Sequence, residues 1–418
     1  MKRTFVVINK HVVRAPNIGH AKNLIFNGEG NGEILSETAS VEEISEQEIM
    51  DYIGEKDEAY TQSSQVLMDE DEAPEDNSLE ANSISNSRNE YLRSENKRLS
   101  RRVEVLKNTQ EEVLLAVYSA AYDAFSGFEP MEIKKPRLKG GPGAPETAVA
   151  VFADWQLGKI TPDYSSEVLA KRIELYTEKL LDITEMQREH HPVNDLHVWM
   201  LGDIVEGEEI FPGQSHLLDA GLYRQVGING PSILQKFFDT ALANFDHVYV
   251  TGVIGNHGAV GGQSRKLHDP ETNMDRLLYK NMETFYKEGR REPRITFNIP
   301  DGRGERNWYA VVNIGNYSSL LIHGDQMPGP TTYYGYFKKV MGWKDGAIPE
   351  NFEDVFMGHY HQQFKMTIGS SMLRISGSPE SFNTYAQEYF SSMSRPCQHL
   401  MFVHPDNGIT SEYSIWLD

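Results

Sequence analysis

The sequence has little cysteine and no long apolar run: Cys397 is its single cysteine among 418 residues. One cysteine excludes an internal disulfide framework, so the chain is not a disulfide-stabilised secreted scaffold. The first residues, MKRTFVVINKHVV, lack the long apolar segment of a signal peptide, and no run reaches the length of a membrane span. We therefore expect a protein of the reducing cytoplasm that does not enter a membrane.

The sequence also lacks a strongly basic segment. Residues 1–82 hold 18 acidic and 6 basic side chains, residues 83–142 hold 8 and 11, and residues 143–418 hold 35 and 23. The net charge of −21 thus argues against simple electrostatic capture of nucleic acid. Acidic side chains of the last segment are expected to face metal ions, which would offset their charge locally.

Several segments precede the region that carries the candidate metal-binding and catalytic residues. Residues 1–55 combine strand-like sequence (TFVVINKHVVRA) with a capping-box pattern at Ser40, which predicts a small α+β module. Residues 56–87 are acidic and polar, which predicts a flexible linker. Residues 126–147 include KKPRLKGGPGAPET and predict a second linker, followed by a large domain at residues 148–418.

Residues 88–125 show a heptad pattern. Two series of residues recur every seven positions: Leu92, Leu99, Leu106 and Val113, and between them Asn96, Val103, Gln110 and Val117. This seam predicts a coiled-coil helix, and its functional interpretation is homodimerisation, with polar Asn96 favouring a paired register. The alternative is a single amphipathic helix that packs on its own domain.

From Ala148 onward, five apolar runs are each followed by metal-competent residues. The runs are VAVFA, HVWMLG, VYVTGVIG, SSLLI and DVFMG. In the same order, they precede Asp154 and Gln156; Asp203; Asn256 and His257; His323; and His359 and His361. Strand ends at one edge of a sheet form the usual ligand crevice of α/β folds, and alternation along a strand places residues i and i+2 on one side. We therefore expect these side chains to converge.

The candidate donors are too many for one tetrahedral ion. They are three imidazoles, two carboxylates and two side-chain amide oxygens, from His323, His359, His361, Asp154, Asp203, Asn256 and Gln156. A mixed nitrogen and oxygen set of this size favours two five- or six-coordinate divalent ions, with Mn²⁺, Fe²⁺, Mg²⁺ and Zn²⁺ as the candidates.

The five blocks DWQ, GDIVEG, GNHG, IHGD and GHYH resemble those of the calcineurin-like metallophosphoesterases, whose pattern is D-x-H, G-D, G-N-H, H and G-H-x-H. The resemblance extends over residues 148–378. It implies an α/β fold, a two-sheet β-sandwich flanked by helices, with residues 148–418 as the catalytic domain. It also implies hydrolysis of phosphoesters by a hydroxide held between two metal ions.

Carried over position by position, the resemblance implies two overlapping ligand sets. One ion would be held by Asp154, Gln156, Asp203 and His361. The other would be held by Asp203, Asn256, His323 and His359, with Asp203 bridging. His257 would face the substrate phosphate as an acid or a stabiliser of the transition state.

Gln156 departs from the family pattern, because the family usually has histidine there. A neutral amide oxygen is a weaker and harder donor than imidazole, which predicts a more exchangeable first ion, biased toward Mn²⁺ or Mg²⁺. Alternatives are that Gln156 only orients a water, or that it marks an inactive site. The DWQ block is similar to that of phage-encoded members of the family. A phage-encoded protein would act in the cytoplasm of its host cell. DWQLG also resembles the first block of the double-strand-break-repair nucleases.

Two further stretches are candidate substrate contacts. One is GNHGAVGGQSRKLH, which carries Arg265, Lys266 and His268, and the other is PGPTTYYGYFKK, which carries Tyr333 and Tyr334. Together with the first block they favour a DNA nuclease of recombination, repair or replication, with a single-stranded end or a partner protein supplying affinity. The alternatives are a phosphodiesterase or phosphatase for small molecules such as cyclic nucleotides, and a non-catalytic scaffold.

Overall fold

The structure is a computed structural model of the whole chain. It describes residues 3–8, 11–15, 40–43, 97, 133–138, 140–208, 210, 213–260, 271–300, 307–327, 333–380 and 395–418. Contacts divide the chain into two units, Met1–Lys97 and Arg98–Asp418. Apart from Lys97, the predicted coiled coil at 88–125 lies outside the described residues, as do the predicted linker at 56–87 and the candidate contacts Arg265, Lys266 and His268.

The first unit contains a three-stranded antiparallel sheet of order β2-β1-β3. Its strands are β1 (Arg3–Ile8), β2 (His11–Ala15) and β3 (Ser40–Glu43). The predicted strand-like stretch thus forms β1 and β2. The helix start predicted at Ser40 is wrong, because this segment pairs with β1. A cross-strand ladder here outweighs a local capping pattern.

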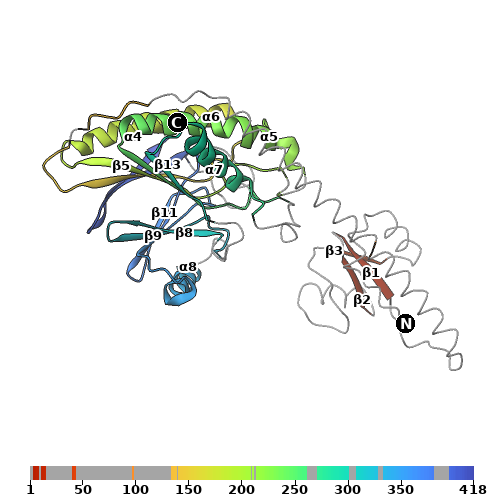
Figure 1. Cartoon of the computed structure of the whole chain (residues 1–418). Coiled ribbons are helices and arrows are strands. Elements are labelled where there is room, and N and C mark those ends of the chain that lie inside the picture. Colours follow the sequence, from red (N-terminus) through yellow and green to blue (C-terminus); the bar gives the residue numbers. More distant parts are fainter. Residues whose placement is uncertain are drawn as a thin grey trace. The chain divides into compact units, whose positions relative to one another are not determined.

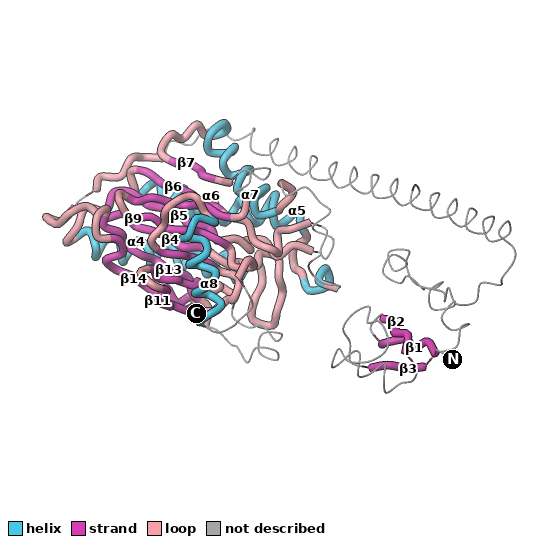
Figure 2. Tube along the Cα trace, turned by 90° about the horizontal axis from the view of Figure 1, so that it is seen from below, coloured by secondary structure: helices cyan, strands magenta, loops and turns pink. Residues whose placement is uncertain are grey.

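The second unit is built on a six-stranded sheet of order β14-β13-β4-β5-β6-β7 (Figure 2). Its strands are β4 (Glu146–Phe152), β5 (Val193–Met200), β6 (His247–Gly252), β7 (Ile295–Asn298), β13 (Cys397–His404) and β14 (Gly408–Trp416). Strands β4 to β7 are parallel, so their carboxyl ends lie at one edge, whereas β13 and β14 are antiparallel additions.

A second, five-stranded sheet has the order β11-β12-β10-β9-β8. Its strands are β8 (Tyr309–Ile314), β9 (Tyr317–Ile322), β10 (Asp354–Met357), β11 (Phe364–Ile368) and β12 (Ser371–Ile375). The central strands β9, β10 and β12 are parallel. Their common direction brings the carboxyl ends of β9 and β10 to one edge of this sheet as well.

The helices cover the outer faces of the two sheets (Figure 1). They are α4 (Ser166–Arg188), α5 (Leu222–Arg224), α6 (Gly230–Asn244), α7 (Met274–Thr284) and α8 (Tyr333–Gly342). Short 3-10 or π turns are η3 (Gln214–Leu217), η4 (Gln225–Asn229), η6 (Phe285–Gly289) and η7 (Trp343–Ala347). The predicted β-sandwich flanked by helices is confirmed.

Side-chain alternation along β4 shows how the layers are held together. Val149 and Val151 pack between the two sheets, whereas Ala150 and Phe152 face the helices α4, α6 and α7. A strand buried on both faces reads as a continuous apolar run, as VAVF does here. A separate apolar cluster joins the outer face of the five-stranded sheet to α8. Within the described ranges, no helix is long and apolar enough to cross a membrane.

Candidate metal centre

The five predicted blocks lie in loops at the carboxyl ends of five strands. Asp154 and Gln156 follow β4, Asp203 follows β5, and Asn256 and His257 follow β6. His323 follows β9, and His359 and His361 follow β10. The site therefore takes side chains from both sheets, at the edge where their parallel strands end. The spacing of the polar residues after each apolar run predicted this placement.

The way in which the ligands converge differs from the prediction. Asp154 and Gln156 lie beyond the end of β4 and do not alternate along a strand. Both have left-handed backbone conformations, with φ of 53° and 48°, as do Asp203 (51°), His359 (74°) and His361 (56°). Such conformations cost about 1–3 kcal/mol each for non-glycine residues and concentrate at functional sites. Sharp loop turns, not strand pleating, aim these side chains inward.

The aromatic residues around Trp155 anchor the first of these loops. The ring of Phe152 lies 4.9 Å from that of Trp155 and 4.8 Å from that of Phe237, in edge-to-face arrangements. Trp155 is fully buried, and its backbone carbonyl accepts a hydrogen bond from the hydroxyl of Tyr164. Trp155 therefore packs in the core. Full burial of an aromatic side chain such as Phe152 contributes about 1.5–3 kcal/mol, which helps to offset the strain in the loop.

Four candidate ligands meet closely at what we call metal position 2, formed by Asp203, Asn256, His323 and His359. His323 Nε2 lies 3.1 Å from Asp203 Oδ2, 3.0 Å from Asn256 Oδ1 and 3.2 Å from His359 Nδ1. Ligand atoms of Asp203, His323 and His359 all lie within 4.8 Å of one another. Nitrogen and oxygen donors that face one another at such distances suit a shared divalent cation.

The other set, metal position 1, consists of Asp154, Gln156, Asp203 and His361. His361 Nε2 lies 3.6 Å from Asp154 Oδ1 and 3.2 Å from Gln156 Nε2. Gln156 Nε2 also lies 3.4 Å from Asp203 Oδ2. The amide of Gln156 therefore reaches the space among the other three side chains, in the place that an imidazole takes in the family pattern.

The chemistry of the donors fits divalent ions at both positions. Asp154, Gln156 and Asp203 are buried, which is costly for two carboxylates without cations. Gln156 Oε1 is buried and has no hydrogen-bond partner among the residues that the structure describes. A half-turn of the amide exchanges its oxygen and nitrogen, so this side chain can present oxygen to a cation. Position 1 would thus hold one ion by oxygen donors and His361, and position 2 the other.

The charges of the site are strongly coupled. For Asp203, burial raises the carboxyl pKa, but His323 and His257 outweigh it and hold the pKa well below its usual range. For His323, burial opposes protonation, yet Asp203 raises the pKa to about 10. Burial and the adjacent His323 lower the pKa of His359 to about 3. Burial raises the pKa of Asp154 to about 6, although His361 opposes the rise.

His257 is held beside this centre by two carboxylates. Its backbone N–H donates to Asp203 Oδ1 at 2.8 Å, and its Nδ1 lies 3.3 Å from Glu206 Oε2. Glu206 is buried and accepts a 2.9 Å hydrogen bond from Gln214. Burial alone would lower the pKa of His257, but Asp203 and Glu206 raise it to about 9. Glu206 therefore engages Nδ1 of His257, whereas Nε2 lies 4.0 Å from Asp203 Oδ2.

Asp275 organises two of the ligand loops, and sequence reasoning missed it. Its carboxylate accepts backbone N–H bonds from Asp203 at 2.9 Å, Ile204 at 3.0 Å, Val205 at 3.1 Å and Gly255 at 2.8 Å. It stands in the first turn of α7, 72 residues after Asp203. The pattern TNMDR around it looks like an ordinary helix start, so no local signal distinguishes this residue.

Glycines allow these loops to approach one another. A Cβ added at Gly255 would lie 2.1 Å from Asp203 Oδ1, and one added at Gly358 would lie 2.5 Å from Asp154 Oδ2. Any larger residue would displace a candidate ligand. The glycines of GNHG and GHYH are therefore part of the site, because they make room for the two carboxylates.

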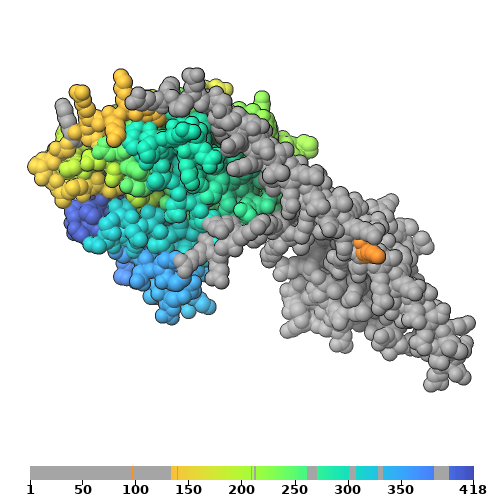
Figure 3. Space-filling view, viewed as in Figure 1, coloured from red at the N-terminus to blue at the C-terminus, as the bar shows by residue number. Residues whose placement is uncertain are grey.

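The candidate substrate contacts Tyr333 and Tyr334 lie at the start of α8. Their exposed fractions are 52% and 71%. The ring of Tyr333 stacks on that of Phe337 with centroids 5.9 Å apart. The α8 region, light blue in the space-filling view, projects from the surface (Figure 3). Tyr360 connects the helix to the site, since its ring contacts both Tyr336 and the candidate ligand His359.

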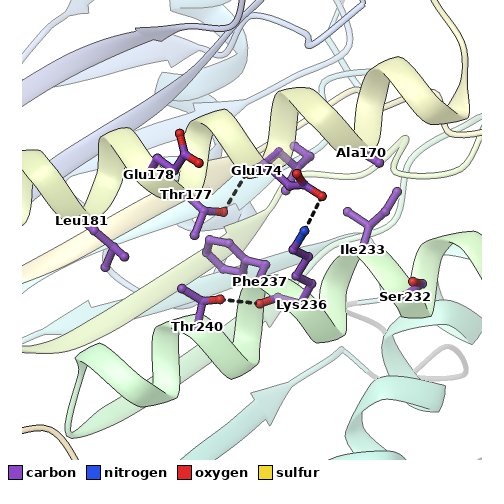
Figure 4. A pocket seen from close by; sticks show the side chains of 11 residues that line it. Ala170, Glu174, Thr177, Glu178, Leu181, Ser232, Ile233, Lys236, Phe237 and Thr240 are labelled. Atoms are coloured by element: carbon purple, nitrogen blue, oxygen red, sulfur yellow. Dashed lines mark hydrogen bonds and ion pairs between the residues drawn. The ribbon is translucent and has the colours of Figure 1, made fainter.

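A hollow of about 250 Å³ lies between α4 and α6 (Figure 4). Ile173 and Phe237 form part of its apolar lining, and Glu174 and Lys236 make an ion pair across it. None of the candidate ligands lines it, so it is separate from the metal centre.

Matches to known proteins are found among solved structures. No family model matches the sequence, and no curated protein matches it significantly. Solved structures that match include Vps29 from Entamoeba histolytica complexed with zinc, at 11% identity and a TM-score of 0.29, covering 64% of this chain and 99% of that one. A novel archaeal phosphodiesterase has 11% identity and a TM-score of 0.30, covering 64% and 99%. A predicted phosphoesterase from Streptococcus pneumoniae TIGR4 has 13% identity and a TM-score of 0.26, covering 64% and 98%.

Proposed function

We propose that the chain is a metal-dependent phosphoesterase that hydrolyses phosphodiester bonds and that its substrate is DNA. One observation carries the proposal: five strand ends from two sheets bring together seven side chains with oxygen or nitrogen donors, Asp203 among them, with His257 beside them. Isolated aspartates and histidines are common, but buried carboxylates and imidazoles gathered at one sheet edge are a costly arrangement that cations would stabilise.

Each side chain has a distinct task in this proposal. Two divalent ions, with Mn²⁺ as the preferred metal, would supply activation of water and charge stabilisation of the phosphate oxygens. Asp203 lies between the two ligand sets and connects them. His257 donates a proton from Nε2 to the leaving oxygen, while Glu206 keeps Nδ1 engaged and thereby fixes which nitrogen reacts.

The preference for nucleic acid is supported by α8. Exposed Tyr333 and Tyr334 offer rings on which bases can stack, and Lys338 and Lys339 follow on the same helix. Base stacking on aromatic side chains contributes about 1–3 kcal/mol per base and depends little on base sequence. With a net charge of −21, we propose a single-stranded or terminal substrate, with a partner protein or a homodimer formed through residues 88–125 adding affinity. We also propose that the protein acts in the cytoplasm.

The test is Mn²⁺-dependent hydrolysis by the full chain. Bis(p-nitrophenyl) phosphate is assayed beside labelled single- and double-stranded DNA, with wild type, Asp203→Ala, His257→Ala and Tyr333→Ala/Tyr334→Ala. We expect DNA cleavage that both site variants abolish and that the tyrosine variant weakens, with the small ester still hydrolysed by the tyrosine variant.

Other outcomes would assign another function. Turnover of the small ester or of cyclic nucleotides without DNA cleavage would favour a small-molecule phosphodiesterase. Absence of any turnover with Mn²⁺, Mg²⁺, Fe²⁺ and Zn²⁺, unrescued by Gln156→His, would favour a non-catalytic scaffold.

A further inference from the structure

Glu380 is a buried residue whose carboxylate contacts His361, one of the candidate ligands of metal position 1, on the side of the ring away from the other candidate ligands. Its Oε2 lies 3.1 Å from Nδ1 of His361, and its Oε1 lies 2.7 Å from Nζ of Lys159. Only 2% of its side chain is exposed. Its backbone N–H donates to Ser378 Oγ at 2.9 Å, and that hydroxyl donates to the carbonyl of Asp154 at 2.6 Å. The segment carrying Glu380 is thereby fixed to the loop that carries the ligands.

We propose that Glu380 is a positioning residue that orients His361 and strengthens it as a ligand, compensating for the weak donor Gln156. The inference rests on the proposed function, since it concerns ion binding at metal position 1. Glu380 lies outside the five blocks, 19 residues after His361, and the local sequence ISGSPES does not distinguish it from a surface loop.

The geometry assigns the two nitrogens of His361 to different partners. Nδ1 faces Glu380, whereas Nε2 faces Asp154 and Gln156. A carboxylate on one ring nitrogen fixes the tautomer and makes the other nitrogen a better donor, as in carboxylate–histidine–metal triads. Glu380 therefore holds the proton of the imidazole at Nδ1 and leaves Nε2 free for an ion.

The two metal positions differ in this respect. At position 2, Nδ1 of His323 faces the backbone carbonyl of Leu201 at 2.8 Å, which is a neutral acceptor. At position 1, the backing group is a carboxylate, and this is also the position at which Gln156 stands in place of an imidazole. The stronger support for His361 thus occurs where the direct ligands are weaker.

Lys159 connects the two features. It belongs to the same DWQLGK stretch as Gln156, and its ammonium group pairs with the second oxygen of Glu380. A buried carboxylate loses its hydration and needs a partner of opposite charge to offset that cost. The ammonium group of Lys159 is this partner for Glu380. The loop that introduces glutamine therefore also provides the cation that keeps Glu380 in place.

The experiment measures Mn²⁺ binding to the full chain by titration calorimetry, with stoichiometry checked by equilibrium dialysis. The variants are Glu380→Gln, Gln156→His and the double variant. The matched control is Glu412→Gln, which removes a carboxylate paired with Lys365 and Arg374 instead. We expect Glu380→Gln to weaken one of two binding events by about 10- to 100-fold and to leave the other unchanged. Gln156→His in the Glu380→Gln background should restore most of the lost affinity.

Several results would overturn the inference. Unchanged affinities for both ions in Glu380→Gln would show that the carboxylate does not act on His361. Equal weakening of both ions, or a loss of thermal stability well beyond that of Glu412→Gln, would make Glu380 a general structural residue. A wild type that binds two ions but shows no rescue by Gln156→His would refute compensation while leaving the proposed function intact. A wild type that binds no divalent ion at all would overturn the proposed function together with this inference.

Discussion

Histidines that are at least partly shielded from solvent have pKa values shifted in opposite directions in two regions of the molecule. At the sheet edge, Asp203 raises the pKa of His323 to about 10 and, together with Glu206, that of His257 to about 9, even though burial opposes both shifts. Within the six-stranded sheet, burial lowers the pKa of both His197 and His399 to about 4. His323 and His399 are both buried, yet their pKa values are shifted in opposite directions.

The difference comes from the carboxylates that face the ring. His323 and His257 each have Asp203 nearby, whereas desolvation dominates for His399 despite the weaker influence of Glu412. Within the sheet, burial favours the neutral form of an imidazole. At the sheet edge, nearby carboxylates favour its protonated form and would also favour bound cations. His359 at the same edge differs, because burial and then the imidazole of His323 lower its pKa to about 3 and outweigh the opposite influence of Asp203. The facing carboxylates, and not burial alone, thus distinguish His323 and His257 from the histidines of the sheet body.

Removing the carboxylate of Asp203 should have the largest effect, because this group sets the charge of the sheet edge and belongs to both ligand sets. In Asp203→Asn, neither ligand set is complete, and we expect hydrolysis to fall by at least about 10³-fold, since metal ions supply several kcal/mol of transition-state stabilisation. The rate of hydrolysis of bis(p-nitrophenyl) phosphate measures the loss of activity, and titration calorimetry with Mn²⁺ measures the loss of metal binding. Asp195→Asn, on strand β5 that precedes Asp203, is the control. Full activity of Asp203→Asn would show that the cluster is not a reactive centre.

His257 should separate proton donation from metal binding. In His257→Gln we expect DNA hydrolysis to fall by about 10²-fold or more, because general acid catalysis supplies this much when the leaving group is an alkoxide. p-Nitrophenolate leaves without a proton, so the small ester should lose much less. Initial rates on the two substrates at saturating Mn²⁺ give the ratio. Equal losses on both substrates would contradict an acid role for His257.

Asp275 should be the most important residue of the edge for stability. Asp275→Asn replaces one accepting oxygen by an NH₂ group that faces backbone donors, so we expect unfolding to become easier by about 2–3 kcal/mol, the cost of leaving buried polar groups unpaired. Urea unfolding at neutral pH measures this change. An unchanged midpoint would mean that the ligand loops hold their shape without this clamp.

The sheet body should show the smallest effect, and only in acid. The pKa of His399 is lowered from 6.5 to about 4 in the folded state, so between these pH values the unfolded chain binds more protons. Stability from this residue is complete above about pH 6.5 and is lost as the pH falls toward 4. The expected loss is about 1–2 kcal/mol at pH 5. His399→Gln should flatten this part of the profile of thermal unfolding against pH, and a profile parallel to that of wild type would contradict the assignment.

Much of the fold and of the candidate ligand set could be predicted from the sequence, because each ligand follows an apolar strand directly. Local sequence marks a buried strand, its end and the polar residue after it, as in VAVFAD. The predicted positions of Asp154, Asp203 and His323 at strand ends agree with the structure. Glycines such as Gly255 gave a further signal, although their role in making room for Asp203 became visible only in three dimensions.

The groups that support the ligands could not be predicted in this way. Asp275 and Glu380 act on residues 72 and 19 positions away in the chain, and nothing in their local sequence records the contact. The left-handed turns at Asp154 and Gln156 also replaced the strand alternation that local pattern suggested. The sequence by itself determined which side chains are available at the strand ends. The tertiary structure decided which of them meet and which buried carboxylates hold them, because such contacts depend on the packing of two sheets and not on neighbours along the chain.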